Sequence, residues 1–238
     1  MADEPKPTSA AQNEEDGHTE PSEVETKEAV QYWGYLFKAD KCGTSKLDRL
    51  LMGIAKHITT TTDPNDDCTD ITPHQLATFY RSVGGNYDSL FLHKPPASIA
   101  FIYKSLGCSH SLQPSDLTDP YSPPSVPALK RHGYVTWQTI QLLLEPAEHV
   151  PFLQTAVHKF DIIDPDEGRR FPRVLPKEVL PSKPDQDMLT WFESVSERLR
   201  HDAQALSRPP WDSADDREYE TDERADAARY FDHQMRRE

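Results

Sequence analysis

The clearest pattern of apolar and polar positions in the chain lies between Gly133 and Phe160. Thr136 is a candidate N-cap there, because its hydroxyl can accept a hydrogen bond from the free amides of the next turn. The apolar residues after it recur at helical spacing and predict one buried face: Trp137, Ile140, Leu143 and Leu144. Pro146 should end this helix, since it lacks an amide hydrogen. A second helix then follows, and its predicted buried residues are Val150, Phe152, Leu153, Ala156, Val157 and Phe160.

The same spacing predicts four more amphipathic helices, over residues 46–59, 73–83, 97–106 and 186–206. Thr72 and Gln75 form a capping box around Pro73, which suits the first helical position. Asp185 is the candidate cap of the last helix. The residues predicted to face the core are Leu47, Leu50, Leu51, Ile54, Ile58, Leu76, Phe79, Tyr80, Val83, Ile99, Ile102, Tyr103, Leu106, Met188, Leu189, Phe192, Val195 and Leu199.

Proline-rich connectors separate these helices. The 21 prolines outnumber the 9 glycines, and a continuous strand ladder tolerates few prolines. Residues 108–132 and 161–185 are therefore predicted to be irregular, with a short helical turn after Pro176. The aromatic residues 30–37 predict a short helix or extended segment lying on the core. The fold class that follows is all-α, a compact domain of several helices.

Two helix starts in the chain follow the same pattern. Ile71 and Thr72 precede one helix, and Val135 and Thr136 precede another. Paired helix–loop–helix units of the EF-hand type join their loops in this way, with the two β-branched residues facing each other. The sequence leaves open whether the core is such a degenerate EF-hand-like pair or another all-α arrangement.

Charge divides the chain into a nearly neutral middle and two acidic ends. The formal net charge is −14, and residues 1–30 contribute −7 while residues 212–238 contribute −5. Acidic segments with few large apolar residues do not bury enough surface to offset the entropy of ordering. We therefore expect a disordered acidic leader over 1–30, a single helical domain over 31–211, and a disordered tail of acidic residues and arginines over 212–238.

The loop that begins at Asp63 resembles a calcium-binding loop only in part. Asp63, Asn65 and Asp67 supply oxygens at its first, third and fifth positions. The twelfth position, where a bidentate glutamate belongs, holds His74. We expect a solvated acidic loop here rather than a specific calcium site.

Other candidate chemistry is weaker. Cys108, His110 and His132 could form a thiol–imidazole pair or a partial zinc site, but their spacing matches no recurring set of zinc ligands. The acidic stretch 161–167 could bind a cation weakly, although its Asp-Pro and Glu-Gly pairs are also ordinary turn residues. We therefore predict no catalytic, cofactor-binding or metal-binding residues, and no cofactor.

Five blocks of the sequence follow one another in a fixed order: YWGYLFKADKCGTSKLDRLLMGIAKHI, ITPHQLATFYRSVGGNYD, IYKSLGCSHSLQP, PSVPALKRHGYVTWQTIQLLLEPAEHVPFLQ and FPRVLPKEVLPSKPD. Over residues 31–191 this succession resembles an uncharacterised fungal family known only as a domain of unknown function. The resemblance implies one compact domain with variable, disordered flanks. It implies no activity, cofactor or catalytic residue.

The function expected from these observations is that of a non-enzymatic protein-interaction module. The alternative is an enzyme or metal-dependent regulator that uses the Cys108, His110 and His132 region or the Asp63 loop. The expected partner is a protein and not nucleic acid, because base-stacking surfaces need basic neighbours to hold phosphates. No apolar run approaches the roughly 20 residues of a membrane span. The expected location is intracellular, in the cytoplasm or the nucleus.

Overall fold

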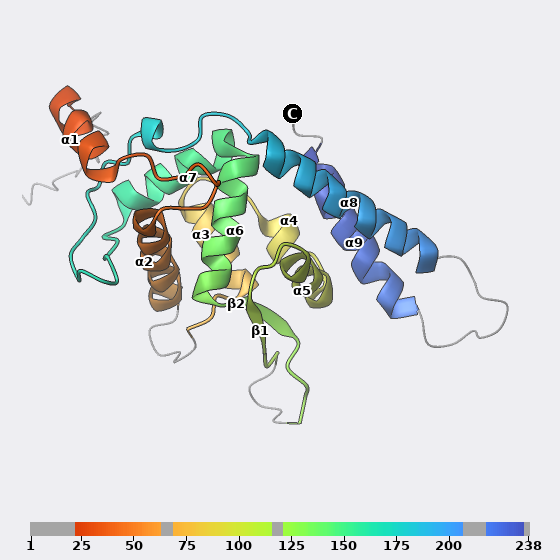
Figure 1. The fold of residues 1–238 in the computed structure, drawn as a ribbon. Coiled ribbons are helices and arrows are strands. Elements are labelled where there is room, and N and C mark those ends of the chain that lie inside the picture. Colours follow the sequence, from red (N-terminus) through yellow and green to blue (C-terminus); the bar gives the residue numbers. More distant parts are fainter. Residues whose placement is uncertain (1–21, 63–68, 116–120, 207–217, 236–238) are drawn as a thin grey trace, which may run out of the picture.

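The computed structural model describes residues 22–62, 69–115, 121–206 and 218–235 and is mostly helical (Figure 1). Its elements in chain order are α1 (Glu23–Trp33), α2 (Ser45–Thr62), α3 (Pro73–Ser82), α4 (Asp88–Phe91), α5 (Pro96–Ser105), β1 (His110–Gln113), β2 (Val126–Leu129), α6 (Arg131–Leu144), α7 (Pro146–Lys159), η1 (Lys177–Val179), α8 (Gln186–Leu206) and α9 (Glu218–Met235). The all-α prediction is confirmed. Within those residues the only sheet is the antiparallel pair β1–β2, which the sequence did not predict. No helix of the described part is long and apolar enough to cross a membrane.

The core is built around α6, which packs against α2, α7, α8 and β2. Trp137 and Tyr134 of this helix are fully buried, and Leu143 is only 3% exposed. The predicted core positions in α2, α3, α5 and α6 are all buried. The break at Pro146 is confirmed as well, because α6 ends at Leu144 and α7 begins at the proline.

The start of α6 corrects the prediction for Thr136. The helix begins at Arg131, so Thr136 lies inside it, and its hydroxyl donates to the carbonyl of His132 at 3.1 Å. Gly133 is also helical. A Cβ at this position would lie 2.0 Å from the carbonyl oxygen of Ser109, so the glycine allows a close approach between the helix and the chain before β1.

The two helix–loop–helix units, α2–α3 and α5–α6, meet through a short antiparallel bridge. The amide of Ile71 donates to the carbonyl of Leu129 at 2.7 Å, and the amide of Leu129 returns a bond of 2.8 Å. Each residue directly precedes the N-cap of its helix. Leu129 therefore takes the place predicted for Val135, which lies within α6 and is partly buried. Kinship with EF-hand domains stays a prediction.

A chain of hydrogen bonds, here called the buried polar chain, crosses the core between α6, α3 and α7. In this chain each side chain donates a hydrogen bond to the next one. His149 accepts at Nδ1 and donates from Nε2, so its ring proton is assigned to Nε2. The bonds run from Trp137 Nε1 to Tyr80 Oη (3.0 Å), Tyr80 Oη to Gln138 Oε1 (3.1 Å), Gln138 Nε2 to His149 Nδ1 (3.3 Å), His149 Nε2 to Tyr87 Oη (2.9 Å), and Tyr87 Oη to Glu148 Oε1 (2.9 Å).

Two helices lie within the ends that were expected to be disordered. Ser22 starts α1 with a capping box, and Trp33 anchors its end by stacking on Phe171 and donating to the carbonyl of Val174 at 2.8 Å. On α9, five residues are buried: Ala227, Ala228, Tyr230, Phe231 and Gln234. Packing thus extends beyond the predicted domain limits of 31 and 211 at these two helices.

Candidate functional site: the lysine groove

The structure places Cys108 in the core, where its environment does not favour thiol chemistry. The side chain is 2% exposed, and burial raises the pKa of its thiol to about 12. A thiol with such a pKa stays protonated at neutral pH and is a poor nucleophile and metal ligand. His110 turns Nδ1 toward the backbone carbonyl of Cys108 at 3.1 Å, and His132 is exposed on the first turn of α6. This neighbourhood therefore does not support the alternative of an enzyme or metal-dependent regulator.

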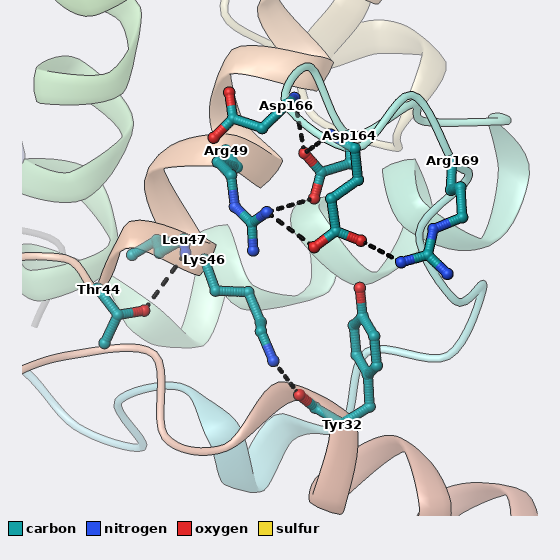
Figure 2. Close-up of polar contacts among 9 residues, drawn as sticks. Tyr32, Thr44, Lys46, Leu47, Arg49, Asp164, Asp166 and Arg169 are labelled. Atoms are coloured by element: carbon teal, nitrogen blue, oxygen red, sulfur yellow. Dashed lines mark hydrogen bonds and ion pairs between the residues drawn. The ribbon is translucent and has the colours of Figure 1, made fainter.

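Arginines pair with carboxylates of the acidic stretch 161–167, and Figure 2 shows two of them, Arg49 and Arg169. Asp164 is buried, and Arg49 of α2 reaches both its Oδ2 and Oε1 of Glu167 at 3.1 Å. Asp161 pairs with Arg173 at 2.8 Å, and the hydrogen bond from this guanidinium lowers the pKa of the Asp161 carboxyl. The ion pairs of Asp164 and Glu167 with Arg49 fasten this loop to α2, and Asp161 is paired with Arg173, so these three carboxylates are not open cation ligands.

Residues 63–68 of the loop that begins at Asp63 lie outside the described part of the chain. At its far end, Asp70 accepts a hydrogen bond of 2.6 Å from the hydroxyl of Ser111 in β1. Across the four described ranges of the chain, no group of three or more His, Cys, Asp or Glu side chains is arranged to hold a metal ion.

A groove with a volume of about 450 Å³ lies between two segments that are far apart in the sequence. We call it the lysine groove. One wall comes from residues 35–41, between α1 and α2, and the other from residues 181–185, directly before α8. Phe37 and Leu143 are buried beneath it, while Tyr35 is exposed. The lining residues are Tyr35, Phe37, Lys38, Ala39, Lys41, Leu143, Pro181, Ser182, Lys183, Pro184 and Asp185.

Backbone hydrogen bonds hold both walls of the lysine groove on the core. The amide of Leu36 donates to the carbonyl of Val179, the last residue of η1, at 2.8 Å. The amide of Asp185 donates to the carbonyl of Leu143 at 2.8 Å, at the end of α6. Walls fixed by main-chain bonds do not have to be ordered when a ligand binds, and a preformed site loses less entropy on binding.

Lys41 joins the two walls. Its ammonium group makes an ion pair with Asp185, which raises the pKa of Lys41 and lowers the pKa of Asp185. Lys41 is also the only non-glycine residue with positive φ, 67°, in the described part of the chain. Such backbone conformations are strained for L-residues and tend to occur at functional sites. This tight turn, closed by a bond from the amide of Cys42 to Oδ1 of Asp40 at 3.0 Å, presents Lys38 at the rim.

The electrostatics of the lysine groove differ from those of the whole chain. Its lining contains three lysines and a single carboxylate, that of Asp185, whereas the chain has a net charge of −14. An apolar floor with a positive rim is complementary to an apolar side chain flanked by acidic residues. The lining contains no histidine or cysteine, and its one carboxylate is paired with Lys41. The arrangement of an apolar floor and a charged rim is therefore suited to binding.

Sequence reasoning did not find this groove. The two segments contain the short polar turns KADK and SKPD, which read as ordinary loops. The ion pair between Lys41 and Asp185 spans 144 positions in the sequence, so no local pattern indicates that the two turns meet.

The family comparison covers every residue that lines the lysine groove. A family model described as a domain of unknown function (DUF7514) matches residues 34–196, which is more than half of the chain. No curated protein and no solved structure matches the chain. The matched range includes all elements from α2 to α7, the lysine groove and the first half of α8. The chain therefore belongs to the DUF7514 family, whose function is unknown.

Proposed function

We propose that the protein is an intracellular protein-interaction module that binds an acidic, extended segment of another protein in the lysine groove. The observation that carries this proposal is the combination of an apolar floor, formed by Phe37 and Leu143, with a rim of three lysines on an acidic protein. Nucleic acid is disfavoured as the partner, because binding along a phosphate backbone depends on an extended basic surface, whereas the positive charge here is limited to the three lysines of this groove.

The proposed binding mode uses both features of the groove. An apolar side chain of the ligand packs over Phe37 and Leu143, and Tyr35 and Pro184 flank it. Acidic residues on either side of that apolar residue lie near Lys38 on one wall and Lys183 on the other. Because these rim charges are exposed, their contribution is screened by salt, and affinity should fall as ionic strength rises.

The direct test is a binding measurement with the full-length protein and a fluorescent peptide that has one leucine between two runs of glutamate. The Lys38→Glu and Lys183→Glu double variant should weaken binding at least about tenfold, equivalent to about 1.4 kcal/mol. The same peptide with glutamine in place of glutamate should bind the wild-type protein weakly.

The matched control changes the charge by the same amount elsewhere. Lys27 on α1 and Lys104 on α5 are both exposed and do not line the groove. A Lys27→Glu and Lys104→Glu variant should bind the peptide as the wild-type protein does. If both double variants lose affinity equally, the peptide senses only overall charge, and the proposal for the lysine groove is wrong.

A further inference from the structure

Helix α9 rests on a surface formed by α5, α6 and α8. Figure 1 shows α9 running beside α8 in the opposite direction, back toward the C-terminus. It packs against α8 and α5 and lies beyond residue 196, where the family match ends. The rest of the chain thus presents a surface to a helix that is not part of the matched domain. We call this surface the helix groove.

One face of α9 fills the helix groove. Its buried positions, Ala227, Ala228, Tyr230, Phe231 and Gln234, recur at the i, i+3, i+4 and i+7 spacing of a helix docked in a groove. The ring of Phe231 lies 4.5 Å from that of Phe192 in α8, and the ring of Tyr230 stacks at 6.3 Å on Trp137 in α6. The two alanines present only methyl groups, and small residues let helices pack closely.

Polar contacts fix the position of α9 along the groove. The hydroxyl of Ser98 in α5 donates to Asp226 at 3.4 Å, and the hydroxyl of Ser196 in α8 donates to Asp232 at 3.2 Å. Arg200 also pairs with Asp232. The helix groove therefore contacts a specific pattern in the segment 226–232, DAARYFD. This pattern is an acidic residue, two small residues, one residue of any type, two aromatic residues and a second acidic residue.

The floor of the helix groove carries polar groups that water could also satisfy. Gln141 of α6 donates from Nε2 to the hydroxyl of Tyr230 at 3.4 Å and accepts at Oε1 from Gln234 at 3.2 Å. Together with the hydroxyls of Ser98 and Ser196, this amide makes the interface between α9 and the helix groove partly polar. Interfaces that separate are more polar than obligate ones.

The packing along α9 is also open on both sides. A cleft of about 330 Å³ separates residues 86–94 from the face of α9 that carries Arg229 and His233. A second cleft of about 320 Å³ lies between the end of α6, the first turns of α8 and Gln234. These two clefts leave the edges of the contact between α9 and the core open to solvent.

We propose that the helix groove is a docking site for an amphipathic helix of a partner protein, and that α9 is its resident occupant. The partner helix carries the pattern of residues 226–232: two small residues followed by two aromatics, with an acid at each end. Ser98 and Ser196 receive the two acids, and Phe192 and Trp137 receive the aromatics. Release of α9 opens the groove to this helix. The site is separate from the lysine groove and does not depend on it.

The first experiment needs no variant. Hydrogen exchange of the wild-type protein should show the amides of α9 exchanging at least about tenfold faster than those of α6, after correction for intrinsic rates, because α9 opens without global unfolding. Equal protection of α9 and α6 would make α9 a permanent part of the core and overturn the proposal.

The second experiment measures binding of a fluorescent peptide of residues 218–235 to the full-length protein. A linked occupant competes at an effective concentration in the millimolar range, so weakening it should favour the free peptide. The full-length Phe231→Ala variant should therefore bind the peptide at least about tenfold more tightly than the wild-type protein does. The same change made in the peptide should abolish binding, whereas Glu197→Ala, which is exposed on α8 and lines neither cleft, should change nothing.

Two results of the second experiment would contradict the proposal. A folded Phe231→Ala protein that binds no peptide would show that the groove accepts no free helix. A dimer that forms with rising concentration and exchanges α9 between copies would assign the groove to a second copy of this chain. If Phe231→Ala does not fold, the hydrogen-exchange result for the wild-type protein decides the question.

Discussion

Two glycines in helices show how single residues set the packing of this protein. A Cβ at Gly133 of α6 would lie 2.0 Å from the carbonyl oxygen of Ser109, and one at Gly53 of α2 would lie 2.6 Å from that of Ile163. In both cases the close neighbour is a backbone atom, which cannot move aside as easily as the end of a flexible side chain. These glycines bring two loops directly against helices.

We predict that Gly133→Ala destabilises the protein by about 1–3 kcal/mol, as overpacking usually does. At an ordinary helical position the same change would stabilise it by about 0.5–1 kcal/mol. Urea unfolding measures the difference, with Thr78→Ala on the exposed face of α3 as the control that should stay within about 0.5 kcal/mol of wild type. A stabilised Gly133→Ala protein would show that Ser109 moves away freely.

Leu143 and Thr136 test the orientation of α6. Leu143→Ala leaves a cavity beneath the lysine groove and should cost about 2–5 kcal/mol. Thr136→Ala should cost less than about 0.5 kcal/mol, since this hydroxyl bonds within the helix and does not cap it. Urea unfolding of both variants checks the prediction. A cost of about 1 kcal/mol or more for Thr136→Ala would restore its role as a cap.

At the scale of elements, the sequence predicted those helices whose signals are local. The capping box of Thr72 and Gln75 starts α3 as expected, and α8 spans Gln186–Leu206 as predicted, with Asp185 accepting from the amide of Met188 at 3.0 Å. In both cases the capping residue and the apolar face of the helix lie within one short segment of the sequence. These helices can therefore be predicted without knowledge of their tertiary contacts.

The features that the sequence did not predict depend on distant partners. The hairpin β1–β2 contains Pro127 and pairs residues across a long connector, so its strands have no alternating pattern that identifies them. The buried face of α9 includes Ala227 and Ala228, which do not stand out in a polar helix. The lysine groove was hidden for the same reason, because its two walls are close only in the folded chain.

The N-terminus of α8 should give a pH-dependent stability. Asp185 caps the helix and pairs with Lys41, and this hydrogen bond lowers the pKa of the Asp185 carboxyl. A carboxyl whose pKa is lowered on folding adds stability above its unfolded pKa of about 3.9, and this stability is lost as the pH falls below that value. At pH 7, Asp185→Ala should therefore cost about 0.5–2 kcal/mol.

The control variant is Asp185→Asn, which retains a capping oxygen and loses the charge. It should be less stable than wild type at pH 7, and the difference should shrink as the pH falls below about 3.9 and the wild-type carboxyl becomes protonated. Urea unfolding at both pH values measures this. A difference that persists in acid would mean that hydrogen-bond geometry, and not charge, sets the contribution of Asp185.

For the molecule as a whole, residues 1–21 of the acidic leader and helix α1 should contribute very differently to stability. Residues 1–21 carry six acidic residues and one lysine and no large aromatic, so we propose that they add little to folding. Their deletion should lower Tm by less than about 2 °C, whereas Trp33→Ala should cost about 3–5 kcal/mol because the indole is buried against Phe171. Calorimetry of both proteins compares them, and a large loss on deleting 1–21 would place the leader within the folded unit.

The buried polar chain from Trp137 to Glu148 has a consequence for the evolution of the family. Every interior member both receives and gives a hydrogen bond, so replacing Gln138 or His149 alone leaves a buried neighbour without its partner. Such a loss costs about 1–3 kcal/mol, whereas replacing both partners with apolar groups can be nearly neutral. Among relatives of this protein, the residues at positions 80, 87, 138 and 149 should therefore change together, as a unit, or not at all.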